Sequence, residues 1–159
     1  MKQLYFLIFI LLSNVSFSQS TYIPDNNFEQ ALIDLGYDTG SLDNYVLTSN
    51  INTITNLSLY AKYISNLTGI EDFIALTRLE CHNNSLTSLV LSQNTALTFL
   101  YCYNNQIVSL DLSQNINVTT LEANDNLLSS IDVSQCVSLY DLRVNQNSLT
   151  SLDVSQNTA

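Results

Sequence analysis

The apolar residues in the C-terminal two-thirds of the chain recur with a period of 21 residues. Four copies, 76–96, 97–117, 118–138 and 139–159, follow one another, and a looser copy of 22 residues, 54–75, precedes them. The apolar residues occupy the same columns in each regular copy, and the ninth column always holds asparagine. Such a period is typical of a solenoid, in which each coil buries its apolar residues only against its neighbours.

Apolar and polar residues alternate near the start of each copy, as they do around Leu79 and Leu100. This alternation predicts a short strand with one buried face, and stacked copies would pair these strands into a parallel sheet. The asparagine column follows the strand, where an inward amide can satisfy backbone groups buried in the turn. We therefore predict a structural asparagine ladder rather than a ligand site. The ladder consists of Asn84, Asn105, Asn126 and Asn147.

The pattern L-x-x-L-x-L/C-x-x-N-x-L resembles the leucine-rich-repeat family. The resemblance is strong over 76–159 and looser over 54–75, where Lys62 takes the place of the asparagine and a different turn is expected. It implies an α/β solenoid, a horseshoe segment with a parallel sheet on its concave face, a mostly non-helical convex side and an N-terminal helical cap. The N-terminal segment and the cysteine-containing coils are also similar to secreted or surface leucine-rich-repeat proteins of Bacteroidetes-type bacteria.

The residues before the repeats divide into two segments. Residues 1–19 have the pattern of a secretory signal peptide, with Lys2 before an apolar run that is too short to span a bilayer. Residues 20–53 are predicted to form an N-terminal cap, with a helix that starts at Asp25 or Asn26 and stops at Gly36. Asn26 and Glu29 have the spacing of a capping box. A loop is expected next, over 37–44, and irregular or strand-like structure over 45–54.

The repeats, 54–159, are expected to be truncated at the C-terminus, because no closing cap follows the fourth regular copy.

Charge narrows the choice of partner. The chain has 14 acidic and 4 basic residues, a formal net charge of −10. This balance argues against nucleic acid, which needs a basic surface, and against anionic membranes. We expect neither a cofactor nor a metal site. Together with the signal peptide, these features predict a secreted or cell-surface protein without membrane insertion after cleavage.

Acidic residues offer two further interpretations. Asp111, Asp132 and Asp153 form a column that could bridge a metal between coils or, as we favour, close local turns through side-chain to backbone bonds. Glu80 and Glu122 lie two coils apart in one outward column, a spacing near that of a glycosidase pair. We expect no enzyme there, because nothing in the pattern excludes water or would raise the pKa of one carboxyl. Asp34, Asp38 and Asp43 miss the spacing of a calcium loop.

Three cysteines would suggest disulfides in a secreted chain. Cys81 and Cys102, however, occupy a core column that Ala123 fills in the next copy, so we expect free, buried thiols. Their positions on neighbouring strands leave a Cys81–Cys102 bond as the alternative. Cys136 falls in a different column.

The outward columns vary while the core columns do not, which is how a solenoid builds a specific surface. Phe99, Tyr101 and Tyr103 place three aromatic residues on one outward strand. We therefore predict a non-enzymatic module for protein–protein interaction, in adhesion or surface recognition, through the concave face. A carbohydrate-binding surface and a spacer for a domain beyond Ala159 are the alternatives. The predicted binding residues are Tyr60, Arg78, Glu80, His82, Phe99, Tyr101, Tyr103, Glu122, Asn124 and Arg143.

Overall fold

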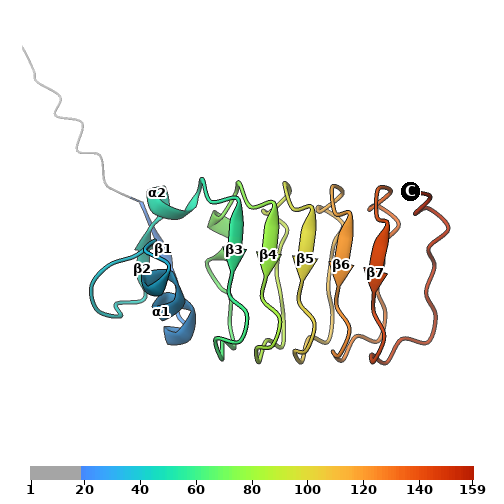
Figure 1. Cartoon of the computed structure of the whole chain (residues 1–159), viewed down its shortest axis with the longest axis horizontal. Coiled ribbons are helices and arrows are strands. Elements are labelled where there is room, and N and C mark those ends of the chain that lie inside the picture. Colours follow the sequence, from blue (N-terminus) through green and yellow to red (C-terminus); the bar gives the residue numbers. More distant parts are fainter. Residues whose placement is uncertain (1–18) are drawn as a thin grey trace, which may run out of the picture.

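A computed structural model describes residues 19–159, so the predicted signal peptide lies outside the described residues except for Gln19. Five short strands pair in chain order into one parallel sheet that runs the length of the repeats (Figure 1). The registry places Leu57, Leu79, Leu100, Leu121 and Leu142 side by side. This confirms the predicted parallel solenoid. The strands are β3 (Asn56–Ser58), β4 (Arg78–Glu80), β5 (Phe99–Tyr101), β6 (Thr120–Glu122) and β7 (Asp141–Arg143).

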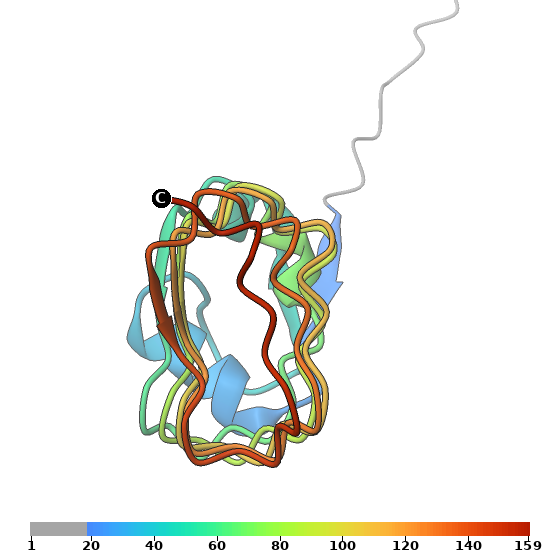
Figure 2. The same cartoon turned by 90° about the vertical axis from the view of Figure 1, so that its right-hand side faces the viewer.

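The coils superimpose closely when the molecule is viewed along the solenoid axis, with the sheet forming one long wall (Figure 2). The opposite wall contains one short 3₁₀ helix, η1 (Ile70–Asp72), and no other helix among the described repeats. The mostly non-helical convex side is thus confirmed. The buried columns of Leu, Ile, Val and Cys fill the interior as one continuous core. We call the outward side of the five-stranded sheet the sheet face; it is the face predicted to be concave.

The segment before the repeats contains two strands and two helices. Strand β1 (Ser20–Tyr22) pairs antiparallel with β2 (Tyr45–Leu47). Helix α1 (Asn26–Asp34) lies between them in the sequence, and α2 (Thr48–Ile51) follows β2. The repeat pattern could not reveal α2, because a helix of four residues has no apolar period to detect.

Helix α1 begins differently from the predicted capping box. Asp25 is the N-cap, and its Oδ1 accepts hydrogen bonds from the backbone N–H groups of Asn27 (2.9 Å) and Phe28 (3.1 Å). Glu29 does not reach back to the cap. Its side chain is fully buried, and Oε1 accepts from Asp43 N (2.6 Å) and Asn44 N (3.0 Å), which fixes the loop before β2. The capping-box prediction is therefore wrong, because the loop supplies backbone donors that only a folded chain brings to Glu29.

Polar and apolar contacts join this segment to the first coil. Asp25 Oδ2 accepts from the backbone N–H groups of Ser65 (2.8 Å) and Asn66 (3.0 Å), so one carboxylate both caps α1 and holds the coil. The rings of Phe28 and Phe73 stack in the core at 6.2 Å between centroids. These contacts are of the kind that a cap makes with the end of a solenoid.

The asparagines of the ninth column point into the turn that follows each strand. Asn105 Nδ2 donates to the carbonyl oxygens of Cys81 (3.0 Å) and Cys102 (3.1 Å), and Oδ1 accepts from Leu86 N (3.0 Å). Each amide thus joins its own coil to the preceding one. The same arrangement recurs at Asn84, Asn126 and Asn147.

The residue before each ladder asparagine adopts the left-handed conformation. Its φ is 56° at Asn83, 52° at Asn104, 54° at Asp125 and 54° at Gln146. Asn and Asp tolerate this region better than most residues, which suits three of the four turns. The looser coil has two such residues, Ala61 and Tyr63, at φ values of 54° and 60°. Its turn therefore differs from the others, as the missing asparagine predicts.

A second asparagine ladder runs along the opposite side of the core, and sequence reasoning missed it. Asn115 Nδ2 donates to the carbonyl oxygens of Leu91 (3.0 Å) and Asn94 (3.0 Å). Asn94 and Asn157 make equivalent bonds. Cys136 interrupts this ladder with a thiol that lies 3.6 Å from the carbonyl oxygen of Asn115. The signal was present as a second recurring asparagine column.

Candidate functional site

The parallel registry sets the outward side chains of the sheet face in rows that cross the strands. Arg78, Phe99 and Asp141 share the first row with Thr120, which is only 4 % exposed and so contributes little surface. In the second row, residues from neighbouring coils differ in charge or in aromatic character. This row consists of Ser58, Glu80, Tyr101, Glu122 and Arg143.

Arg78 is fixed on the sheet face by contacts on three sides. Its guanidinium pairs with Glu80, with Nη2 and Nε each 2.8 Å from Oε1. The guanidinium carbon lies 4.7 Å from the ring centre of Tyr101 and 5.4 Å from that of Phe99. These are cation–π distances, so the arginine occupies one side of each ring.

Three rings stack across the coils beyond the strand ends. The His82 ring lies between Tyr60, at 5.3 Å and 8° between planes, and Tyr103, at 4.4 Å and 17°. Burial lowers the pKa of His82 against the opposing attraction of Glu80 and Glu122. Its Nδ1 is buried and has no partner among the described residues. The stack therefore holds a neutral imidazole near neutral pH.

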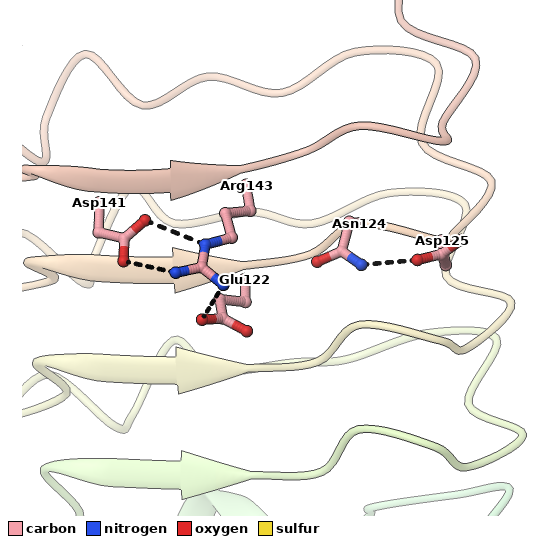
Figure 3. A network of polar contacts seen from close by, with 5 residues as sticks. All are labelled: Glu122, Asn124, Asp125, Asp141 and Arg143. Carbon is pink, nitrogen blue, oxygen red and sulfur yellow. Dashed lines mark hydrogen bonds and ion pairs between the residues drawn. The ribbon is translucent and has the colours of Figure 1, made fainter.

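Both carboxylates considered as a glycosidase pair are engaged in ion pairs. Burial favours a higher pKa at Glu80, but hydrogen bonds from Ser58 and Arg78 outweigh it and bring the pKa below the ordinary value. Glu122 Oε1 lies 3.1 Å from Arg143 Nη1, and Arg143 Nη2 lies 3.3 Å from Asp141 Oδ2 (Figure 3). A general acid needs a raised pKa, so Glu80 is unsuited to that role.

The sheet face contains two adjoining depressions of about 250 and 400 Å³. Tyr103 and Glu122 line both. The first is also lined by Arg78, Glu80, His82 and Tyr101, and the second by Asn124, Arg143 and Asn145.

The structure thus brings all ten predicted binding residues onto one surface, with Tyr60 the most open at 55 % exposure among the aromatic ones. Most of the aromatic rings are not free, however. They stack on one another or on Arg78, which a pattern taken one strand at a time does not show. Sequence reasoning also missed Asp141 and Ser58, which hold Arg143 and Glu80. Ser58 could have been found as the row neighbour of Glu80, and Asp141 as the outward residue two positions before Arg143 on the same strand.

The aspartate column lies away from the sheet face and forms local turns. Oδ1 of Asp111, Asp132 and Asp153 accepts in each case from the backbone N–H of the serine two residues on, at 2.9 Å. These bonds lower the pKa of all three carboxyls. Furrows of about 280 and 240 Å³ lie between the coils beside Asp111 and Asp132. Within residues 19–159, no group of three His, Cys, Asp or Glu side chains is placed to hold a metal ion.

All three cysteines are buried and unbonded to one another. Burial raises the pKa of the Cys102 thiol to about 12. The pKa of the Cys81 thiol is also raised, first by burial and then by the nearby Cys102. Both groups are thus unreactive thiols in the folded protein.

We predict that iodoacetamide leaves Cys81 and Cys102 unmodified in the native protein. All three cysteines should react after denaturation without reductant, because the thiols are free. Mass spectrometry of the intact protein distinguishes these states. A stoichiometric Cys81–Cys102 bond, seen as two fewer modifications after denaturation, would contradict the prediction.

No helix in the described part of the chain is long and apolar enough to cross a membrane.

Comparison with known proteins gives sequence and structural relatives. The chain is 37 % identical over 78 residues to internalin J of Listeria monocytogenes, which covers 49 % of this chain and 8 % of that protein. The solved functional domain of the Listeria monocytogenes internalin InlJ, which includes a cysteine ladder, has 35 % identity and a TM-score of 0.81. That match covers 89 % of this chain and 32 % of the domain. No protein-family profile matches the chain.

Two further solved structures share the architecture. A leucine-rich-repeat protein of Leptospira interrogans has 26 % identity and a TM-score of 0.63, over 68 % of this chain and 30 % of that one. Internalin InlF of Listeria monocytogenes has 24 % identity and a TM-score of 0.73, over 85 % and 40 %, which shows the fold alone. The chain spans less than half the length of each of these relatives.

Proposed function

We propose that this leucine-rich-repeat solenoid, a relative of the internalins, is a secreted or cell-surface module that binds a protein partner through the sheet face. The observation that carries the proposal is the set of ordered aromatic and charged side chains on that face. Tyr60, His82 and Tyr103 form one stack, and Arg78 lies over Tyr101 and Phe99.

Such an arrangement favours affinity for a physical reason. Association costs free energy when mobile side chains become fixed, at about 0.5–1.5 kcal/mol for each long side chain. Rings that are already stacked, and an arginine already paired, have lost much of that freedom before a partner arrives. Tyr and Arg are also the residue types that dominate binding energy at interfaces.

The relatives support a non-enzymatic interaction module, because they are internalins and leucine-rich-repeat proteins. A role in adhesion or surface recognition, and secretion by the predicted signal peptide, belong to the same proposal. The relatives come from Listeria and Leptospira, so the likeness to Bacteroidetes-type proteins rests on the N-terminal segment and the cysteine-containing coils alone.

Carbohydrate binding receives less support from the geometry. Sugars stack on open ring faces, but Arg78 covers one side of Tyr101 and His82 one side of Tyr103. The spacer alternative concerns whatever follows Ala159 and predicts no ligand for the sheet face.

Two parallel assays separate these functions. The immobilised protein is exposed to a surface-protein extract and, separately, to a glycan array. We expect saturable retention of a protein and no glycan signal. Glycan binding without a protein partner would favour the carbohydrate alternative, and the absence of both would favour the spacer.

A further inference from the structure

We propose that the centre of the sheet face receives a basic side chain of the partner, a lysine or an arginine, between the Glu122 carboxylate and the Tyr103 ring. This inference rests on the proposed protein-binding function and names the chemistry of its central contact.

The two depressions of the sheet face locate the contact. Tyr103 and Glu122 are the two residues that line both. His82, from the preceding coil, covers one side of the Tyr103 ring at 4.4 Å. The second depression is built from residues of the following coils, so the other side of the ring borders it. A cation in that depression would face an aromatic ring and a carboxylate together.

The carboxylate has capacity for a further donor. Glu122 Oε1 contacts Arg143, whereas Oε2 has no donor among residues 19–159 (Figure 3). The Glu122 side chain is 16 % exposed. Partial removal from water strengthens the attraction between this carboxylate and an incoming cation.

The chain already contains the arrangement that we infer for the partner. On the preceding coils, Arg78 pairs with Glu80 and lies over Tyr101. Glu122 occupies the same row as Glu80. The residue two positions before Glu80 is Arg78, whereas the residue two positions before Glu122 is Thr120. Arg143 pairs with Oε1 of Glu122, so the partner's lysine or arginine would bind at Oε2 and lie beside the Tyr103 ring, as Arg78 binds Glu80 and lies over Tyr101.

The local charge selects a basic group. Lys62, Arg78 and Arg143 are the lysine and arginine residues of the described chain, and each is paired with a carboxylate. Glu122 and Arg143 line the second depression, and Asp141 and Asp125 contact two lining residues, Arg143 and Asn124, from outside it (Figure 3). These four side chains together carry three negative charges and one positive charge, a net charge of −2. An acidic side chain would be repelled there, and the net charge of −10 adds to that repulsion.

The test uses short blocked peptides as probes. Acetyl-Gly-Arg-Gly-amide is titrated into the isotope-labelled protein and followed by NMR, with a citrulline peptide as the neutral isostere of arginine. We expect shifts at Tyr103 and Glu122 with the arginine peptide and none with the citrulline peptide. Glu122→Gln should raise the apparent dissociation constant about five- to tenfold, because a charged hydrogen bond and an ion pair are lost.

The matched control is Asp111→Asn, which removes the same charge from the aspartate column. It should leave the arginine peptide's affinity unchanged, and a thermal melt of each variant confirms folding. Equal binding of the citrulline peptide, equal weakening by Asp111→Asn, or no shift at Tyr103 and Glu122 would each overturn the inference.

The proposed function is judged separately. A captured protein partner that needs Tyr101 and Tyr103 but binds Glu122→Gln normally would keep the function and remove this contact. A partner that needs neither tyrosine would remove the function, whatever the peptide result.

Discussion

Asn105→Ala should lower the free energy of unfolding by about 1–3 kcal/mol. The amide of Asn105 bonds the carbonyl oxygens of Cys81 and Cys102 and the N–H of Leu86, all within the buried turn. Alanine leaves the buried N–H of Leu86 without a partner and removes one of the two side-chain donors at each carbonyl oxygen, which keep their bonds from Asn84 and Asn126. Because the bonds join two coils, the loss should weaken the stacking of the solenoid as well as one turn.

Asn124→Ala is the matched control. Asn124 lies on the sheet face, and its side chain bonds only the carboxylate of Asp125 (2.6 Å). Its removal should change the unfolding free energy by less than about 0.5 kcal/mol. Both variants are compared in a urea titration monitored by circular dichroism. Equal midpoints for the two would refute the structural role of the ladder.

The repeats could be predicted because their information is local and recurs. Leu79, Leu100, Leu121 and Leu142 occupy one column, so one alternating strand pattern, seen four times, defines both the inward face and the registry. The thiols were placed in the core by the same comparison of columns. A column that tolerates Ala123 requires a small buried side chain, and Cys81 and Cys102 are buried.

The N-terminal segment was less predictable because its contacts are long-range. Asp25 caps helix α1 and also accepts hydrogen bonds from the backbone N–H groups of Ser65 and Asn66, some forty residues away. Glu29 likewise bonds a loop that follows the helix. Local spacing suggested a capping box for Glu29, and the loop donors outcompete that local arrangement.

On the sheet face, the outward direction of the side chains could be predicted from the sequence, but their contacts across the coils could not. Alternation predicts which side chains point outward, because successive residues on a strand face opposite sides. It does not predict that His82 lies between Tyr60 and Tyr103, since this depends on side-chain conformations on three coils. The pairing of Arg143 with both Glu122 and Asp141 depends on neighbouring strands in the same way.

The second large effect concerns binding. Replacing both Tyr101 and Tyr103 with alanine should weaken affinity for a protein partner by at least about 2 kcal/mol, or roughly thirtyfold. One truncation removes the ring beneath Arg78, and the other removes the end of the ring stack. Both side chains are half-buried on the sheet face and outside the apolar core, so the fold should persist.

The most direct measurement of sheet-face binding is therefore the dissociation constant of the captured partner for three proteins, each with a thermal melt. They are the natural chain, the Tyr101→Ala, Tyr103→Ala double variant, and Tyr140→Ala, which removes a tyrosine that is 65 % exposed outside the binding rows. We predict a loss of roughly thirtyfold in the double variant alone, with closely similar melting temperatures for all three. Unchanged affinity of a folded double variant would contradict binding through the sheet face and would direct the search to the side of Asp111, Asp132 and Asp153.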